Sequence, residues 1–226
     1  MKKPFTKHRW VRLLIRVAAW YVAGILLLGL LYRILPPVST LMLADVITLN
    51  GYTRERVSLG EVSTNMLRAV IRAEDGRFCE HHGVDWQSMN QAIEDAVEED
   101  GPSRGASTIS MQVAKNLFLW PHRSYARKIL EVPIAMYLDF IWPKTRMMEV
   151  YLSMAEWGKN LYGIEAASQH YFGKSAKSLS SWEAASLAAA LPNPLKRNPS
   201  RASAYHASYA KRIVGGIGNA DISCLR

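Results

Sequence analysis

Apolar residues recur at intervals of three and four over most of the chain beyond residue 63, which is the spacing of one face of a helix. Polar breaks such as EEDGPSRGAS and LPNPLKRNPS separate the periodic stretches. The predicted helices cover about residues 64–76, 85–98, 108–118, 123–141, 144–155, 163–171, 181–190 and 201–214. The alternation of strands and helices that a Rossmann or P-loop fold requires does not occur. The pattern therefore predicts a mainly α domain over residues 63–226.

The first 35 residues follow a different pattern. Basic residues crowd positions 1–16, and the stretch VAAWYVAGILLLGLLY that follows carries no charge. With Arg33 able to reach the far interface, residues 17–35 approach the ~20 residues that a helix needs to cross a bilayer. Because the basic flank lies only on the N-terminal side, the positive-inside rule predicts a cytoplasmic tail at 1–16, a transmembrane anchor at 17–35 and a domain outside the membrane. The alternative is a cleaved signal peptide, for which TLMLADV is a poor cleavage site.

Residues 36–62 connect the anchor to the helical domain. Pro36 and Pro37 end the anchor, and the turn-forming pieces NGY and TRERVS lie among short apolar runs. We expect a hairpin-like or extended connector.

The net charge of +9 and the pI of about 9.6 make nucleic acid, anionic lipid and phosphate-bearing substrates candidate partners. A domain held outside the membrane meets little nucleic acid, so no nucleic-acid partner is expected and the charge indicates the membrane surface or a phosphorylated lipid. The two cysteines, Cys79 and Cys224, have neither metal-site spacing nor a CxxC arrangement. We therefore expect neither a zinc site nor a disulfide framework.

Glu74 is the first candidate catalytic residue. With Leu67, Val70 and Ile71 it occupies positions i, i+3, i+4 and i+7 of one helical face, so it points toward the core. Burial disfavours the ionised carboxylate and raises its proton affinity toward that of a general base. The alternative is a glutamate at a helix end that bends out to water.

The stretch GASTISMQVAKNLF supplies a second group. After an N-cap at Ser107 or Thr108, a polar stripe of Thr108, Gln112 and Lys115 runs beside an apolar one. A hydroxyl, an amide and an ammonium group suit a sugar and a phosphate. The alternative is an ordinary solvated helix face.

In RSYARKILEVPIAMYLDFIW, Arg123, Arg127 and Glu131 follow one another at i+4 steps, and the opposite side is expected to carry Leu130, Ile134, Leu138 and Ile141. Arg before Glu is the weaker order for an ion pair, which makes intrahelical pairing a poor explanation. Two guanidinium groups can bind a diphosphate bidentately. Two carboxylates and a cationic cluster are what glycosyl transfer from a sugar diphosphate needs.

The run EDGRFCEHHG resembles the E-D-x-x-F-x-x-H-x-G motif of the peptidoglycan glycosyltransferases, glycosyltransferase family fifty-one. The matching positions are Glu74, Asp75, Phe78, His81 and Gly83. The second motif is matched by Gly105, Ser107, Thr108, Gln112, Lys115 and Asn116, and the third by Arg127, Lys128 and Glu131. KTRMMEVYLS and YGIEAASQHYFGKSAKSLSSWEAASLAAALPNP resemble the fourth and fifth, so the resemblance covers about residues 60–200 in the right order.

The resemblance implies a lysozyme-like, two-lobed helical domain that polymerises lipid II into β-1,4-linked glycan with inversion. Glu74 would be the general base and Glu131 would assist in the donor site. The implied substrate-binding residues are Asp75, Phe78, His81, Gly83, Thr108, Gln112, Lys115, Asn116, Arg123 and Arg127. The implied partners are lipid II, the lipid-linked growing glycan and the membrane, and other cell-wall synthesis proteins stay open. No tightly bound cofactor is implied; Mg²⁺ or Mn²⁺ is often invoked at the donor site, but no cage of carboxylates is evident.

The layout of one anchor and a short domain resembles the monofunctional biosynthetic transglycosylases of Gram-negative bacteria. This implies the inner membrane, with the catalytic domain in the periplasm. Met111 and Ser153 depart from the family pattern, at positions we expect to be buried. A lysozyme-like hydrolase and a non-catalytic scaffold are the competing hypotheses. A hydrolase would not need the cations Lys115, Arg123 and Arg127, and a scaffold would not need the carboxylates Glu74 and Glu131.

Overall fold

The computed structural model describes residues 7–98, 107–122 and 124–226. The chain divides into two compact units, Met1–Pro36 and Pro37–Arg226. The first contains a single long helix, α1 (Lys7–Tyr32). Within it Arg9–Tyr32, 24 residues of mean hydropathy 2.1, is the one stretch of the described chain that is helical, long and apolar enough to cross a membrane. The helix extends the predicted anchor into the basic tail and ends before Pro36.

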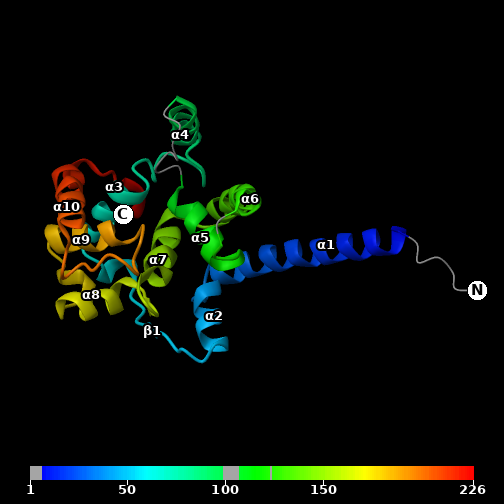
Figure 1. Cartoon of the computed structure of the whole chain (residues 1–226), viewed down its shortest axis with the longest axis horizontal. Helices are drawn as coiled ribbons and strands as arrows, with labels where there is room; N and C mark the ends of the chain where they lie inside the picture. Colours follow the sequence, from blue (N-terminus) through cyan, green and yellow to red (C-terminus); the bar gives the residue numbers. More distant parts are fainter. Residues whose placement is uncertain (1–6, 99–106, 123) are drawn as a thin grey trace, which may run out of the picture. The chain divides into compact units, whose positions relative to one another are not determined.

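The second unit is mostly helical (Figure 1). Its α-helices are α2 (Thr40–Ile47), α3 (Thr64–Glu74), α4 (Trp86–Glu98), α5 (Ile109–Phe118), α6 (Tyr125–Ile141), α7 (Lys144–Met154), α8 (Ile164–Phe172), α9 (Ser181–Ala190) and α10 (Ala204–Gly216). Short 3-10 turns are η1 (Leu59–Glu61), η2 (Ala176–Ser178), η3 (Ile217–Asn219) and η4 (Ser223–Leu225). This architecture confirms the predicted mainly α class and is consistent with a lysozyme-like domain.

Side-chain caps fix where several helices begin. Ser63, Thr108, Ser124, Ser180 and Ser203 each accept a hydrogen bond from a backbone N–H in the first turn of the helix that follows. All the helices predicted beyond residue 63 are confirmed to within a few residues. The predicted starts at 123 and 201 are too early, because the caps at Ser124 and Ser203 set the first helical residues at 125 and 204.

The connector prediction is wrong for residues 40–47, which form α2. The Ser39 hydroxyl accepts a hydrogen bond from Met42 N at 3.2 Å, and Met42 is fully buried. A cap followed by one buried anchor is enough for a short helix that packs on α5. The eight residues of α2 are too few for a periodic pattern to be recognised in the sequence.

The extended part of the connector is not a hairpin. β1 (Thr53–Arg54) lies at one edge of a three-stranded sheet of order β1-β3-β2, whose other strands are β2 (Glu156–Gly158) and β3 (Leu161–Tyr162). β1 is parallel to β3, with Thr53 opposite Leu161, whereas β2 is antiparallel to β3. The partner of β1 is therefore about a hundred residues away, where no local pattern could indicate it.

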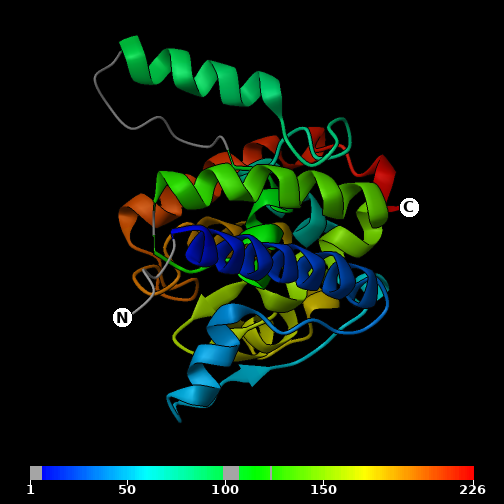
Figure 2. The same ribbon diagram turned by 90° about the vertical axis from the view of Figure 1, so that its right-hand side faces the viewer.

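Two groups of helices pack around α3 and α5. α3 packs against α9 and α10, and α5 packs against α6 and α7. Alanine and other small residues make up much of the buried 184–190 segment of α9, so α3 can approach closely. α4 lies apart from the other helices in both views (Figures 1 and 2). The last residue of α3 and the polar face of α5 carry the candidate site.

The structure contradicts the expectation for the cysteines. Cys79 and Cys224 form a disulfide with a Cα–Cα distance of 5.5 Å, across 145 residues of sequence. The chain beyond α10 turns back through η3 and η4, so the C-terminus reaches the loop that follows α3. Spacing along the sequence carries no sign of this approach, because the fold alone brings the two ends together.

Candidate active site

Glu74 is the last residue of α3 and is half-buried. Its Oε2 accepts a hydrogen bond from Gln112 Nε2 on α5 at 2.8 Å. Burial raises the pKa of Glu74, against the Gln112 hydrogen bond and the positive charge of Lys115, which both lower it. Glu74 therefore faces a neighbouring helix rather than bending out to water. Its raised pKa means that it binds a proton more tightly than an exposed glutamate does, which suits a general base.

Lys115 lies one helical turn beyond Gln112 and is half-buried. Burial lowers the pKa of its ammonium group, whereas the charges of Glu131 and Glu74 raise it. Lys115 is thus within electrostatic range of both carboxylates. No described residue forms a hydrogen bond with its ammonium group, and no described carboxylate oxygen lies within 4.0 Å of its Nζ. An ammonium group held in this way can accept an anion.

Glu131 on α6 is buried and paired with two cations. Arg127 Nη1 lies 3.4 Å from Glu131 Oε1, and Lys128 Nζ lies 3.2 Å from Oε2. The expectation that intrahelical pairing explains little is therefore wrong: both ion pairs lie within α6. Lys128 also donates a hydrogen bond to the Ser107 hydroxyl, which joins α6 to the segment before α5.

The expected division of α6 into two faces is also wrong in part. Arg127 and Glu131 are buried on the same side as Ile134 and Leu138, whereas Leu130 is 39% exposed. Burial is possible because the carboxylate and the cations compensate one another. Arg127 Nε is buried with no hydrogen-bond partner in the described part of the chain. Arg123, expected to be the second arginine of this group, lies outside the described residues.

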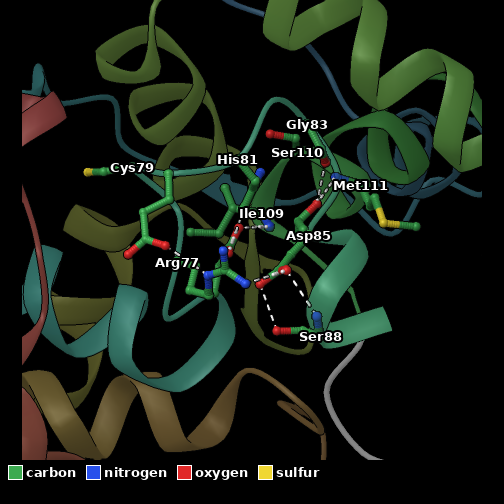
Figure 3. A network of polar contacts seen from close by, with 12 residues as sticks. Arg77, Cys79, His81, Gly83, Asp85, Ser88, Ile109, Ser110 and Met111 are labelled. Atoms are coloured by element: carbon green, nitrogen blue, oxygen red, sulfur yellow. Dashed lines mark hydrogen bonds and ion pairs between the residues drawn. The ribbon is translucent and has the colours of Figure 1, made fainter. Parts of the chain in front are cut away.

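Asp75 has a different environment from its neighbour Glu74. Its Oδ1 lies 2.8 Å from His81 Nε2, and its Oδ2 accepts a hydrogen bond from Ile109 N at 2.8 Å. Figure 3 shows His81 and the start of α5 at Ile109 converging in this network. Asp75 and His81 are both buried. The pair ties the loop after α3 to the first turn of α5.

Gly83 and Thr108 form a second tie between the same segments. Thr108 Oγ1 donates to Gly83 O at 2.7 Å while accepting from Met111 N at 3.1 Å. Gly83 has a φ of +86°, and a Cβ there would lie 2.8 Å from Ala135 O. Only glycine fits both the backbone conformation and the space.

Phe78 is fully buried beneath the Lys144 ammonium group, which lies 4.7 Å from the ring centroid. Lys144 also donates to His81 O at 2.7 Å. Five of the residues expected to bind substrate are therefore buried in contacts that hold the loop, namely Asp75, Phe78, His81, Gly83 and Thr108. Asn116, half-buried on α5, accepts a hydrogen bond from Thr40 through its backbone oxygen.

A cavity of about 140 Å³ opens beside Glu74. It is lined by residues from the end of α3, the start of α4 and the start of α5, among them Arg72, Ser88 and Ser107. Polar and charged side chains on three segments therefore surround the candidate base.

Sequence patterns missed two further residues near Glu74. The positive charge of Arg197 lowers the pKa of Glu74, although Arg197 lies in an irregular segment with no periodicity. Tyr209 on α10 donates to Ala73 O at 3.3 Å. Tyr209 is brought there by the packing of α10 on α3, and Arg197 lies against the rings of Tyr205 and Tyr209 on α10.

The two departures from the family pattern are both buried, as expected. Met111 is fully buried on α5. Ser153 accepts hydrogen bonds from Arg54, at its backbone oxygen from Nε (2.9 Å) and at its hydroxyl from Nη2 (3.1 Å). Ser153 therefore joins the end of α7 to β1 and lies outside the polar contacts of Glu74.

A sequence model of the family described as Transglycosylase matches residues 42–217. The chain belongs to the transglycosylase family. The matched range begins within α2, upstream of the predicted domain start at 63, and includes every described candidate residue.

Several curated relatives carry the name biosynthetic peptidoglycan transglycosylase. The protein of Agrobacterium fabrum is 56% identical over 166 residues, which is 73% of either chain. That of Rhizobium meliloti is 45% identical over 223 residues, 97% of this chain and 94% of the relative. That of Brucella suis is 49% identical over 179 residues, 79% of this chain and 80% of the relative. The family resemblance inferred from the motifs is thereby confirmed.

Proposed function

We propose that this transglycosylase is a peptidoglycan glycosyltransferase of cell-wall synthesis, which polymerises lipid II and releases undecaprenyl diphosphate. The observation that carries the proposal is the position of Lys115, which has no ion-pair partner among the described residues and is within electrostatic range of both Glu74 and Glu131. A base next to a partly buried cation suits a reaction in which a hydroxyl is deprotonated and an anionic group departs.

In the proposed reaction, Glu74 removes the proton of the acceptor's 4-hydroxyl. The oxygen attacks the anomeric carbon of the donor, the new C–O bond forms, and the bond to the diphosphate breaks with its electrons. Attack opposite the leaving group inverts an α-linked donor to a β-1,4 product. Glu74 retains the proton until it passes to solvent.

The cations of α5 and α6 take up the charge on the departing diphosphate. Of these cations, Lys115 is the one whose ammonium group has no ion-pair partner among the described residues, so no protein carboxylate competes with the diphosphate for it. One terminal nitrogen of Arg127 lies near Glu131, and its Nε has no hydrogen-bond partner among the described residues, so part of the guanidinium group can bind a phosphate. Glu131 holds Arg127 and Lys128 in place, and Arg123 is proposed to join them. Glu131 is therefore a positioning residue for the leaving-group site.

The described residues include no group of three or more His, Cys, Asp or Glu side chains that could hold a metal ion. We therefore assign no step of the reaction to a divalent cation. A divalent ion carried by the substrate's diphosphate stays a prediction, which a polymerisation assay with and without a chelator tests.

The membrane is the proposed location of both enzyme and substrate. Besides α1, the described part of α6 exposes an apolar stripe at i, i+4, i+11 and i+15, made of Tyr125 (93%), Ile129 (71%), Met136 (44%) and Phe140 (88%). Such a stripe suits contact with lipid, where an undecaprenyl-linked substrate resides.

The proposed topology is a cytoplasmic N-terminus and a periplasmic domain at the inner membrane. The Cys79–Cys224 disulfide supports it, because disulfides persist in the periplasm and are reduced in the cytoplasm. A reporter enzyme that works only in the periplasm, fused after Arg226, should be active. Activity of a reporter that works only in the cytoplasm, fused at the same position, would show that the domain lies in the cytoplasm and would contradict the proposed topology.

The experiment that tests the function is incubation of the purified full chain with labelled lipid II. Polymer and undecaprenyl diphosphate should both appear. Purified lipid-free sacculi, offered in parallel, should stay uncut, since the cationic site serves a diphosphate that they lack. Release of soluble fragments from sacculi without polymer from lipid II would instead favour a lysozyme-like hydrolase.

A further inference from the structure

Tyr151 on α7 is fully buried, and its hydroxyl lies 3.5 Å from Gln112 Oε1 on α5. Gln112 Nε2 in turn donates to Glu74 on α3. A chain of contacts therefore links three helices, from a buried hydroxyl through one amide to the candidate base. Among the described residues no other acceptor contacts the Tyr151 hydroxyl.

The amide of Gln112 has two different ends, and its two neighbours require different ones. An ionised Glu74 can only accept a hydrogen bond, so it requires the NH₂ end. Burial raises the pKa of Tyr151 well above its usual value, so its hydroxyl stays protonated and can donate to the C=O end. One orientation of the amide satisfies both neighbours, and it is the orientation found.

The opposite orientation would favour the opposite protonation state. If the amide turned by 180°, Oε1 would face Glu74, and only a protonated carboxyl could donate to it. The Tyr151 hydroxyl would then face an NH₂ group, from which it could accept a hydrogen bond but to which it could not donate. Its own proton would be left without an acceptor among the described residues, and a buried donor without an acceptor costs free energy. The hydroxyl therefore disfavours the orientation that stabilises neutral Glu74.

We propose that Tyr151 is a positioning residue for the transfer reaction, which acts through Gln112 to keep Glu74 ionised and fixed in direction. The inference rests on the proposed function of Glu74 as base. Nothing in the motif comparison or in the helical periodicity assigns this role to Tyr151.

Other charges also act on Glu74, and the test has to separate them from Tyr151. The described ionisable groups coupled to Glu74 are Asp75 on its own segment, Lys115 on α5, Tyr151 on α7, Arg197 before α10 and Tyr209 on α10. Tyr151→Phe removes one hydroxyl and leaves the other four groups unchanged.

The decisive experiment is a titration of Glu74 in the detergent-solubilised full chain. The carboxyl band is followed by difference infrared spectroscopy, with Glu74→Gln as the blank, and no substrate is needed. Tyr151→Phe should shift the titration upward by about 0.5 to 1 pH unit, the equivalent of one neutral hydrogen bond. The acidic limb of kcat/KM for lipid II should move by the same amount, with near-wild-type activity on the alkaline side.

Tyr171→Phe is the matched control. The Tyr171 hydroxyl is half-buried and donates to Trp157 O at 2.9 Å, and Glu74 does not act on its pKa. This variant should leave the titration of Glu74 unmoved. A general loosening of the fold by a lost tyrosine hydroxyl would instead lower activity at every pH in both variants.

A double-mutant cycle tests whether the effect passes through Gln112. Gln112→Leu should by itself shift the titration upward, and Tyr151→Phe added to it should have no further effect. An unshifted titration in Tyr151→Phe or in Gln112→Leu overturns the inference, as does a full shift by Tyr151→Phe in the Gln112→Leu background. If the infrared shift appears but lipid II is never polymerised, the proposed function fails while the coupling stands.

Discussion

The surroundings of Glu74 and Glu131 differ in the partners that each carboxylate has. Glu74 ends α3, half-buried, with one amide as its hydrogen-bond donor and a cavity of about 140 Å³ beside it. Glu131 lies within α6, buried, with an arginine and a lysine against its two oxygens. A carboxylate with a raised pKa and open space beside it can exchange a proton, whereas one with a cation against each oxygen can hold those cations in place. These surroundings suit the different roles that the family resemblance implies, a general base at Glu74 and assistance in the donor site at Glu131.

The largest expected effect is at Glu74. Glu74→Gln keeps the shape and can keep the Gln112 contact but cannot take a proton, so lipid II polymerisation should fall ~100-fold to 10,000-fold. The measurement is the initial rate of polymer formation by purified protein, with circular dichroism to verify the fold. Polymerisation near the wild-type rate would mean that another group is the base.

The second prediction concerns the disulfide, which is a further difference between the two glutamates. It anchors the loop that follows Glu74, whereas α6, which carries Glu131, has no disulfide. Replacing Cys79 and Cys224 with serine should lower the free energy of unfolding by about 2–5 kcal/mol, as for other native disulfides. Thermal melting in detergent measures this. Dithiothreitol should lower the melting temperature of the wild type and leave that of the double variant unchanged; equal responses would mean that the bond does not form in the native protein.

The cationic side is tested at Arg127. Arg127→Lys keeps the charge and loses the planar fork, so activity should fall roughly tenfold to a hundredfold, with more loss in Arg127→Ala. Arg201 is exposed, so Arg201→Lys is the matched control and should leave lipid II polymerisation unchanged. Full activity in Arg127→Lys would place the diphosphate elsewhere.

A smaller effect concerns stability. Because burial raises the pKa of Glu74, the folded state binds this proton more tightly than the unfolded state does. Its contribution to stability is therefore present at low pH and lost as the pH rises through the folded pKa. At pH 7.5, Glu74→Gln should be more stable than the wild type by roughly 0.5–1 kcal/mol. The difference should shrink as the pH falls toward 4.5, the ordinary pKa of the group. Melting curves across this range would contradict the burial of Glu74 if the difference stayed constant or had the opposite sign.

Much of the fold could be predicted from the sequence because each helix beyond residue 63 carries its own periodicity and often its own cap. Glu74 was predictable for the same reason, since its position on an apolar face is a local property. α2 was too short for periodicity, and the pairing of β1 with β3 and of Cys79 with Cys224 depends on segments far apart in the chain.

The ion pairs of α6 were missed for another reason. The order Arg127 before Glu131 is weak on an exposed helix, but burial strengthens a pair that water would screen. The charge of Arg197 near Glu74 and the proposed role of Tyr151 were hidden because both residues lie far from Glu74 in the sequence.

The most direct test of the difference between the two glutamates is a comparison of kcat and KM for lipid II in Glu74→Gln and Glu131→Gln. Glu74→Gln should lose kcat with little change in KM, because the base acts in the chemical step. Glu131→Gln should raise KM and keep the acidic limb of its pH profile, because it disorders the cations that hold the diphosphate. A Glu131→Gln enzyme with normal KM and no turnover, or a Glu74→Gln enzyme restored by saturating lipid II, would contradict the assignment.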